Sequence, residues 1–524
     1  MKAVKLIFLL FILVVPKANF AQFGTLDTSF DSDGIVITSF NSFDATVQFL
    51  LIQPDKKILA GGTISKGGLN QFGLARYNSD GSLDESFGNL GKVISNYPEL
   101  MLLSTMALQS DGKIVVAGNL FNSSFTISHF VLVRYDTNGL LDTTFGIDGR
   151  VITNLSDKLD KITSIIIQSD GKILASGTTS DDSNYSDFSI VRYNPDGTLD
   201  PSFGNNGITI TSIRTWDFGY AIALQDDNKI VISGSTSNEF NPVFGLDYDF
   251  LVLKYDKYGV LDATFGNGGS VIIGTTEANE KALSVKVLPD GKIVIGGEHH
   301  IMKYSFMISQ LLPNGNVDTS FGNNGIVLNE LASQFIESVA KQTDGKFLIT
   351  EYHGTGGCCS ADIKLMRFLT DGNFDTTFGT NGIVTADFLN ENNQANSIVV
   401  QDDGKILIGG VSGNQIHSDY GLARFNSELA LSTPVNQIVN NTFFAYPNPV
   451  NQSVNLDFNL KESQNLDVDL FNINGVKVIN LLNNKQFPLG FTTQKLQLPE
   501  TLSKGVYFLS ISNGTLLSNI KIVK

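Results

Sequence analysis

Short apolar runs alternate with turn-forming residues along this chain, and residues 164–211 show the order most clearly. The runs SIIIQ, KILASG, FSIVRY and GITIT are separated by an SDG turn, by a polar loop, and by a stretch that contains NPDG and NNG. Asp-Gly and Asn-Gly pairs supply the positive φ angles that tight reversals need, and the runs are rich in β-branched and aromatic residues. The pattern therefore predicts a four-stranded antiparallel sheet.

The same unit recurs through most of the chain. A Leu-Asp-x-x-Phe signature, with variants, places aspartates 56 to 62 residues apart, at Asp27, Asp84, Asp142, Asp200, Asp262, Asp318 and Asp375. A Gln-x-Asp-Gly-Lys signature and an Arg-Tyr pair also occur once per unit, again with variants. A fixed period of this size indicates units that cannot bury their own apolar surface and need neighbours. The third run is apolar on both faces, as expected of a sheet between two others. We predict an all-β protein with a seven-bladed β-propeller over residues 22–428.

The phase of the repeat predicts how the propeller closes. The array begins with the fourth run of a unit, residues 34–38, and ends with the third run of a unit, residues 421–425. All seven sheets have four strands only if the N-terminal strand completes the C-terminal sheet. Such pairing also removes the exposed edge of an open array. We therefore expect residues 34–38 to pair with 421–425.

The motifs QSDGKI, RYNPDG and LDPSFGNNG resemble the delta-60 repeat, a bacterial extracellular repeat, over roughly residues 25–426. The resemblance implies a β-propeller-like domain and leaves the biochemical role open. The fifth unit departs most, with Leu288, Gln310 and Val317 in place of the signature residues. The repeated arginine and the repeated aspartate are expected to form structural pairs, and one such pair is missing where Gln310 stands.

Charge and composition narrow the function. The 524 residues carry 36 basic and 52 acidic side chains, a net charge of −16, which argues against a nucleic-acid surface. Fifty glycines with 17% charged residues fit a turn-dense β protein. Nucleophile-elbow, zinc-helix and phosphate-loop signatures are absent from the sequence, so we expect neither cofactor nor metal and lean against an enzyme.

Residues 1–21 read as a signal peptide, because two lysines precede ten apolar residues, which are too few to span a bilayer. No later stretch has the length of a transmembrane helix. Cys358 and Cys359 are adjacent in a Gly-rich loop. They are free, joined as a vicinal ring, or paired between molecules, and we favour a loop feature without a catalytic role.

Loop lengths indicate where a ligand binds. The separation of the repeated lysine from the Arg-Tyr pair varies from 18 to 25 residues, whereas the turn segments keep their lengths. In a propeller, this variable loop and the fourth-to-first connection lie on one face, and function usually sits on loops held by a rigid scaffold. We name this the variable-loop face. Its candidate ligand-binding residues are Trp216, Asp217, Tyr220, His299, His300 and His353.

Two interpretations of these residues remain open. Aromatic and imidazole side chains that converge on one face would stack on sugars or hold a peptide. Alternatively, the histidines simply occupy polar loops of several blades and do not converge. The main hypothesis is a non-catalytic binding or adhesion module for glycan or protein. The alternative is a hydrolase or lyase acting on polysaccharide through loop carboxylates and histidine on the same face, and a third is a passive spacer.

A second pattern begins after a polar linker, residues 429–442. Six short alternating runs over residues 443–524 predict a small β-sandwich. Its motif residues are Tyr446, Pro447, Asn448, Pro449, Asn474, Gly475, Gly505 and Tyr507. Asn474 and Gly475 form a two-residue hairpin signal.

The order YPNP, LFNINGVKV, LSKGVYFLSI and IKIVK resembles the type A C-terminal sorting domain of the type IX secretion system. The resemblance implies recognition by the secretion machinery and removal by a sortase-like peptidase, with possible attachment to anionic lipopolysaccharide. We therefore expect a secreted protein or one displayed on the outer-membrane cell surface.

Overall fold

The computed structural model describes residues 24–524 except 42, 67–68, 96, 98, 182–184, 239, 242–244, 276–277, 302–303, 330–335, 354–361, 389–391, 414–416, 428–442, 447–449, 451, 461–462, 473–476, 500 and 514–515. Every regular element of this part is a β-strand. It contains no helix that is long and apolar enough to cross a membrane. The chain divides into two compact units, Gln22–Glu428 and a unit that contains Leu429–Lys524.

The strands of Gln22–Glu428 pair antiparallel in groups of four. The first groups are β2 (Asp44–Ile52), β3 (Ile58–Lys66), β4 (Leu69–Tyr77), β5 (Lys92–Ile94); β6 (Leu100–Leu108), β7 (Ile114–Phe121), β8 (Ser128–Tyr135), β9 (Arg150–Thr153); and β10 (Lys161–Ile167), β11 (Ile173–Ser180), β12 (Ser186–Tyr193), β13 (Ile208–Thr211). The next group is β14 (Trp216–Leu224), β15 (Ile230–Ser237), β18 (Asp249–Tyr255), β19 (Ser270–Ile273), which a single parallel pair joins to β12. A small hairpin, β16 (Phe240–Asn241) and β17 (Gly245–Leu246), lies between β15 and β18.

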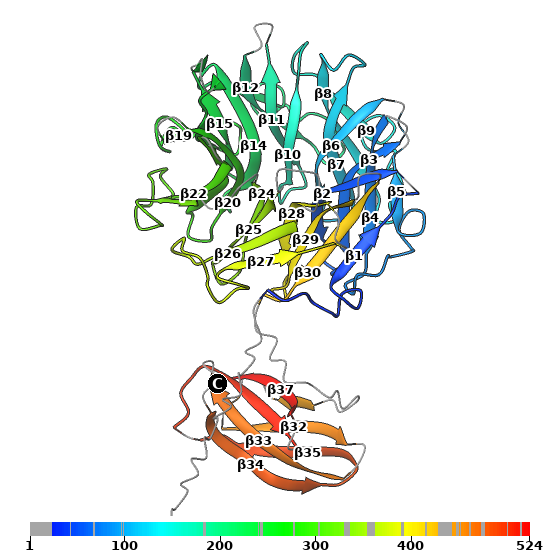
Figure 1. The fold of residues 1–524 in the computed structure, drawn as a ribbon, viewed down its shortest axis with the longest axis vertical. Coiled ribbons are helices and arrows are strands. Elements are labelled where there is room, and N and C mark those ends of the chain that lie inside the picture. The colour runs from blue at the N-terminus through cyan, green and yellow to red at the C-terminus, as the bar shows by residue number, and fades with distance from the viewer. Residues whose placement is uncertain are drawn as a thin grey trace, which may run out of the picture. The chain divides into compact units, whose positions relative to one another are not determined.

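The remaining groups follow the same order. They are β20 (Asn279–Val287), β21 (Ile293–His300), β22 (Tyr304–Leu311), β23 (Ile326–Asn329); β24 (Ile336–Lys341), β25 (Phe347–His353), β26 (Asp362–Phe368), β27 (Ile383–Ala386); and β28 (Asn392–Val400), β29 (Ile406–Gly413), β30 (Ser418–Phe425) with β1 (Ile35–Thr38). Figure 1 shows these sheets spread around a centre, with first strands such as β2, β10, β14, β20 and β28 innermost.

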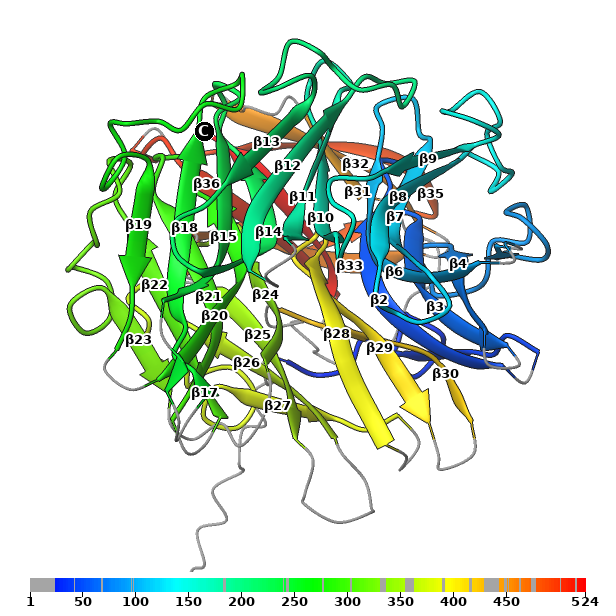
Figure 2. The ribbon, with the colours of Figure 1, turned by 90° about the horizontal axis from the view of Figure 1, so that it is seen from above.

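The N-terminal strand pairs as the phase of the repeat predicts. In β1, Ile35 lies opposite Ala423 and Thr38 opposite Tyr420 of β30, antiparallel. Strand β2 also contacts β28, β29 and β30, and Figures 1 and 2 show these strands beside the β2–β5 sheet. The first and last repeats of the unit are therefore in contact.

Local turn chemistry explains why the strands reverse where they do. In the turn after β10, the Gln168 amide donates to the Lys172 carbonyl at 2.8 Å, and Gly171 adopts a φ of 83°. The equivalent residues Lys56 and Asn228 adopt φ angles of 68° and 61°. These two positions pay a conformational cost that glycine avoids. The hydrogen bonds therefore fix the turn, and glycine is the residue that adopts its positive φ with the least strain.

Every innermost strand contains a β-bulge at the same level, which the sequence pattern did not predict. The register shifts between Val47 and Phe49 in β2 and between Gly219 and Ala221 in β14, and the other five innermost strands behave alike. A glycine of the second strand faces a carbonyl of the bulged strand at Gly62, Gly118, Gly177, Gly234, Gly297 and Gly410. A Cβ atom at any of these would overlap that carbonyl. Glycine permits this close approach in six sheets, and Glu351 lies opposite Ile336 at the equivalent register of the seventh.

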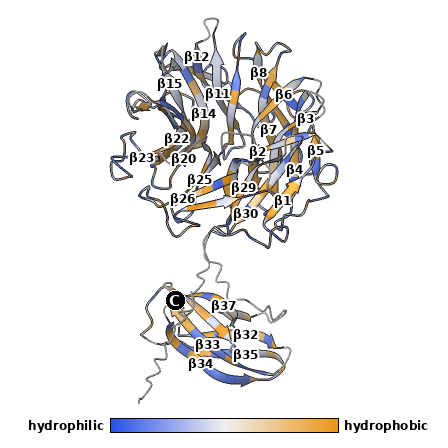
Figure 3. Cartoon of the chain, viewed as in Figure 1, coloured by the Kyte–Doolittle hydropathy of each residue, from blue (hydrophilic) through white to orange (hydrophobic). Residues whose placement is uncertain are grey.

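Apolar clusters lie between neighbouring sheets, and Figure 3 shows apolar residues concentrated in strands such as β1 and β26. A further cluster joins Val47 and Leu50 of β2 to Leu407 and Leu422 of β29 and β30. Buried tyrosines add polar links, because the hydroxyl groups of Tyr193 and Thr153, in adjacent sheets, lie 2.6 Å apart. Packing on both faces explains why the third strands are apolar throughout.

The repeat signatures hold neighbouring sheets together. Arg192 donates from Nε to Asp200 at 2.7 Å and from Nη1 to the Lys257 carbonyl of the next sheet at 2.6 Å, and Lys172 donates to Asp200 at 2.9 Å. Burial alone would raise the pKa of Asp200, but the hydrogen bonds from Lys172 and Ser202 keep it below its ordinary value. The predicted Arg–Asp pairs are thus present. Five arginines make both contacts, namely Arg76, Arg134, Arg192, Arg367 and Arg424.

The fifth unit differs as its sequence indicates. Gln310 donates to Asp318 at 2.9 Å, and Lys292 donates to the same carboxylate at 2.7 Å. A neutral amide therefore replaces the guanidinium, while the lysine ion pair is kept. These contacts explain the repeat signatures as structural elements.

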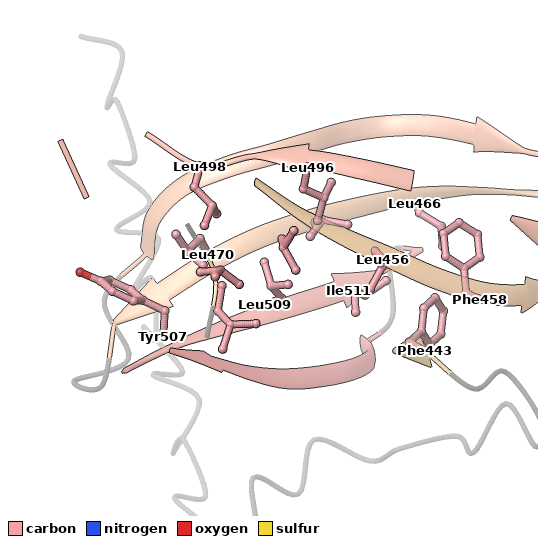
Figure 4. Close-up of a cluster of buried hydrophobic side chains, with 14 of the residues drawn as sticks. Phe443, Leu456, Phe458, Leu466, Leu470, Leu496, Leu498, Tyr507, Leu509 and Ile511 are labelled. Atoms are coloured by element: carbon pink, nitrogen blue, oxygen red, sulfur yellow. The ribbon is translucent and has the colours of Figure 1, made fainter. Parts of the chain in front are cut away.

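The C-terminal unit has two sheets. One contains β31 (Phe443–Tyr446), β32 (Ser453–Leu460) and β35 (Gly490–Gln497), and the other contains β33 (Gln464–Asn472), β34 (Lys477–Phe487), β36 (Val506–Ser512) and β37 (Leu516–Val523). Residues of both sheets share one buried apolar core, which Figure 4 shows for Phe458, Leu496, Leu470 and Ile511 among others. Alternating burial along β32 and β33 matches the alternating sequence pattern.

The sorting-motif residues in the described part have structural contacts. Gly505 and the terminal Lys524 exchange backbone hydrogen bonds of 3.0 and 2.9 Å. The Tyr507 hydroxyl donates to the Ser503 carbonyl at 3.0 Å, and Tyr446 is exposed. Several predicted features lie outside the described residues: the signal peptide 1–21, Cys358, Cys359, the linker 429–442, Pro447, Asn448, Pro449, Asn474 and Gly475.

Candidate ligand-binding face

The lone tryptophan begins the innermost strand β14 and meets an aromatic ring from the neighbouring sheet. Trp216 and Tyr185 lie edge to face, with ring centroids 5.8 Å apart and an interplanar angle of 82°. Tyr185 precedes β12 and keeps 47% of its surface exposed, while Trp216 is half-buried. Their strands meet at the Ser186–Trp216 pair, the one parallel strand pair between the two sheets in the described part of the chain. An exposed aromatic pair therefore lies where a second-to-third strand loop adjoins a fourth-to-first connection.

Half-buried aromatic side chains follow Trp216 along β14. Trp216, Phe218 and Tyr220 are half-buried, whereas the intervening Asp217 and Gly219 are buried. Phe218 contacts Tyr248 edge to face at 5.6 Å. Tyr220 occupies the bulge, and its hydroxyl accepts a hydrogen bond from Ser235 at 3.3 Å. We call Tyr185, Trp216, Phe218, Tyr220 and Tyr248 the aromatic stripe.

Charged side chains near the aromatic stripe are paired with one another. Arg214 Nη1 lies 2.6 Å from Asp249 Oδ2, and Lys281 Nζ lies 2.9 Å from Glu298 Oε2. Tyr220 lies within the field of the second pair. Both pairs are partly exposed, so they contribute hydrogen-bonding groups to the face and little net charge.

Asp217 is a buried anchor of the connection that precedes β14. Its carboxylate accepts the Ile213 amide at 2.6 Å and the Thr236 hydroxyl at 2.5 Å. Burial raises its pKa above the ordinary range, partly offset by these hydrogen bonds. Asp160 anchors the connection before β10 with equivalent hydrogen bonds, because it accepts the Leu155 amide at 2.7 Å and the Thr179 hydroxyl at 2.6 Å. Asp217, one of the predicted site residues, is therefore buried and positions its neighbour Trp216.

Glu280 and His299 replace the Asp–Thr pair in the next sheet. Glu280 is fully buried and accepts the Thr275 hydroxyl at 2.7 Å, and its Oε1 lies 3.7 Å from Nε2 of His299. The other ring nitrogen of His299 lies 2.9 Å from Ser305 Oγ. Burial raises the pKa of Glu280 to about 7, and the nearby Asp249 and Asp247 add to the rise. His299 is likewise buried, so it supports the connection from inside the sheet.

We expect Glu280 to make stability depend on pH. Its folded pKa of about 7 lies above the ordinary value of about 4.3, so its contribution is complete below about pH 4 and is lost as pH rises through 7. Between pH 5 and 8 the loss should reach about 3 kcal/mol. The variant Glu280→Gln cannot ionise and should show a flatter dependence over that window. Denaturant unfolding of the wild type and the variant at pH 5 and pH 8 measures this difference. An equal loss of unfolding free energy in the two proteins would refute this role of Glu280.

The histidine candidates lie in different strands. His300 ends β21 opposite Asn279 and Tyr304 and is half-buried. His353 ends β25, where its backbone pairs with Asp362, and its side chain lies outside the described residues. Trp216 and Tyr220 come from β14 of the neighbouring sheet. The aromatic contacts therefore define the face more closely than the histidines do.

Sequence reasoning did not select Tyr185, Phe218 or Tyr248. Trp216 and Tyr185 are 31 positions apart in the sequence, and only the pairing of adjacent sheets brings their rings together. The alternation WDFGY was a usable signal, because period two places Trp216, Phe218 and Tyr220 on one face. No group of three or more potential metal-ligating side chains occurs within the described part of the chain.

Comparison with known families identifies the two units. A model described as "Domain of unknown function (DUF5122) beta-propeller" matches residues 53–87, 109–145, 168–203, 288–321, 360–378 and 401–431. A model of the secretion system C-terminal sorting domain matches residues 445–524. These matches define a class: a secreted or surface-displayed repeat protein with a C-terminal sorting domain. The protein carries DUF5122 β-propeller repeats followed by a type IX sorting domain. The delta-60 name itself remains a prediction.

Several solved structures match this chain at low similarity. An acylaminoacyl peptidase matches at 10% identity and a TM-score of 0.39, over 80% of this chain and 59% of its own. The β-propeller domain of the Trilobed protease from Pyrococcus furiosus matches at 12% identity and a TM-score of 0.39, over 74% of this chain and 95% of its own. Sqt1 from Chaetomium thermophilum matches at 10% identity and a TM-score of 0.41, over 75% of this chain and 98% of its own. This chain thus spans about three fifths of the peptidase. A search among curated proteins finds no match.

Proposed function

We propose that this protein is an exported binding module that holds a glycan or protein ligand on its variable-loop face. The observation that carries the proposal is the exposed Tyr185 against Trp216, on segments that differ in length between repeats. Exposed aromatic rings on rigid strands give large contact area at low entropic cost. The repeat signatures are occupied with structural contacts, which leaves the variable segments for a ligand.

The proposal includes a closed ring of seven four-stranded blades. Three kinds of contact seen between neighbouring sheets recur between the β28–β30 sheet and the β2–β5 sheet. Arg424 donates to the Ser79 carbonyl as Arg192 does to Lys257, Tyr77 bonds Thr38 at 2.8 Å, and an apolar cluster fills the boundary. Closure gives each loop two fixed neighbours, which keeps the binding face rigid.

The C-terminal unit is proposed to be a β-sandwich that delivers the module. Two sheets around one apolar core support this architecture. Export by a signal peptide, removal of the sorting domain by a sortase-like peptidase, and attachment to anionic lipopolysaccharide belong to the same proposal. They follow from the resemblance of residues 443–524 to the sorting family.

An array of glycans and extracellular-matrix proteins tests the binding function. The protein should retain ligands from the array, and Tyr185→Ala and Trp216→Ala should weaken retention about tenfold or more. Tyr258→Ala is the matched control, because Tyr258 is 52% exposed in the turn between β18 and β19, on the segments of constant length. Retention independent of Trp216 would contradict the proposal. Release of reducing ends from polysaccharides would favour the hydrolase or lyase instead.

A further inference from the structure

We propose that the ligand of the variable-loop face is an uncharged glycan chain, stacked along the aromatic stripe of β14. This inference rests on the proposed function and narrows it to one ligand class. It follows from the spacing of the rings, the pairing of the charges around them, and the charge of the whole chain.

The first argument is the geometry of the stripe. Trp216 and Phe218 alternate with the buried Asp217, so their side chains project from the same side of β14. Tyr220, at the β-bulge, adds a third half-buried ring. Residues two apart on a strand are separated by about 6.7 Å, which makes a linear series of rings. Tyr185 and Tyr248 extend the series at two points through edge-to-face contacts. A linear series of partly exposed rings suits an extended ligand with repeated flat apolar patches, which the C–H faces of sugar rings provide.

The second argument concerns the polar groups. Asp249 is held by Arg214, Glu298 by Lys281, and Asp217 by the Thr236 hydroxyl and backbone amides. Asp181 accepts the backbone amide of Tyr185 at 2.9 Å. Charges that are already neutralised by a partner can still exchange hydrogen bonds with hydroxyl groups at the surface. These ion pairs would have to break before either partner could bind a charged group of the ligand, and breaking a partly buried ion pair is unfavourable. Hydroxyl-rich, uncharged ligands avoid that cost.

The third argument excludes anionic glycans. The chain carries 52 acidic against 36 basic side chains, a net charge of −16. Like charge lowers the rate and the affinity of association for a uronate or sulfated polymer. Asp187 adds negative potential near Asp217, and Asp247 adds it near Glu280. A cationic peptide is the remaining competitor, and the pairing of the carboxylates disfavours it.

Isothermal titration of the full-length protein tests the ligand class with defined probes. The uncharged probes are oligosaccharides of β-1,3-glucan, xyloglucan and galactomannan, and the charged probes are oligogalacturonate, heparin oligosaccharides and oligolysine. We expect at least one uncharged probe to bind, with affinity reduced about tenfold or more in Trp216→Ala and in Tyr185→Ala. Tyr258→Ala should leave affinity unchanged. Because Tyr185 is largely exposed, its variant also checks that a loss in Trp216→Ala is not caused by misfolding.

The outcomes separate this inference from the proposed function. Binding of a charged probe that depends on Trp216, without binding of an uncharged one, would overturn the ligand class and leave the binding function standing. If no probe binds in this way but a protein on the array does, the ligand class is again wrong. Should neither the probes nor the array show binding that depends on Trp216 or Tyr185, both proposals fail. Binding of an uncharged probe that persists at high salt supports the inference, because stacking is not screened.

Discussion

Removal of residues 24–40 will lower the melting midpoint of the repeat unit by on the order of 10 °C, because it deletes the strand that completes the β28–β30 sheet. Phe30, Val36 and Phe40 are buried, and each contributes about 2 kcal/mol on burial. The deletion also removes Asp27, whose carboxylate lies 2.7 Å from Arg424 Nε and 2.7 Å from Lys405 Nζ. Leaving a buried guanidinium without its carboxylate costs about 3–5 kcal/mol.

Differential scanning calorimetry measures this effect, with deletion of Leu429–Lys524 as the control. That deletion removes a separate compact unit and should leave the transition of the repeats in place. A midpoint that stays unchanged without residues 24–40 would show that β1 does not stabilise the array, and the closed ring would have to be abandoned. The variant Asp27→Asn offers a milder version, since it removes the charge and retains the strand.

The second large effect is expected at a single methyl group. Gly297→Ala should destabilise the protein by about 3 kcal/mol or more, because a Cβ atom there would overlap the Lys281 carbonyl of the bulged strand β20. The backbone would have to shift, and the bulge of β20 would be distorted. Gly296, the preceding residue of β21, is the matched control. Its Cβ would meet only side-chain atoms, the nearest being Val339 Cγ2 at 3.2 Å, and these can move.

Denaturant unfolding of Gly297→Ala and Gly296→Ala at one pH measures the difference. Both substitutions place alanine in the same strand, so changes in strand propensity and unfolded-chain entropy are alike. Equal destabilisation would mean that the close approach of the Lys281 carbonyl is not what requires glycine.

Under the proposed function, the residues that stabilise the repeats differ from the residues that bind the ligand. Asp200, Arg192 and Lys172 and their equivalents are engaged between sheets, which explains their regular spacing. The aromatic stripe belongs to one pair of sheets and has no counterpart defined by the repeat signatures. Substitution of signature residues should therefore change unfolding, whereas substitution of the stripe should change binding.

The fold was accessible from the sequence because its determinants are local. Turn residues at 169–171 and 194–197 and the apolar runs between them specify strands and reversals, and the constant period predicts the seven units of the proposed ring. The phase of the repeat even predicted that β1 pairs with β30, and the substitution at Gln310 predicted the missing arginine contact. The turns and strands needed only residues adjacent in the chain, and the pairing of β1 with β30 needed the phase of the repeat at both ends of the array.

The candidate site was accessible only in part. The sequence placed Trp216, Asp217 and Tyr220 on a connection between sheets, whereas the structure places all three in strand β14. Asp217 and His299 are buried and hydrogen-bonded inside the protein. Alternation along β14 was visible in the sequence, whereas the bulge and the burial of the carboxylate were not. Burial depends on which neighbouring sheet covers a side chain, and this is a property of packing between units.

By itself, the sequence determined the all-β class, the repeat, the pairing of its ends and the sorting domain, because hydrogen-bonded turns and alternating burial follow from short-range residue order. The tertiary structure alone decided that Tyr185 meets Trp216, that Glu280 lies beside His299, and that Gly297 faces the Lys281 carbonyl. These contacts join segments from about 16 to 31 residues apart, and their geometry is set by strand register and by the packing of sheet on sheet.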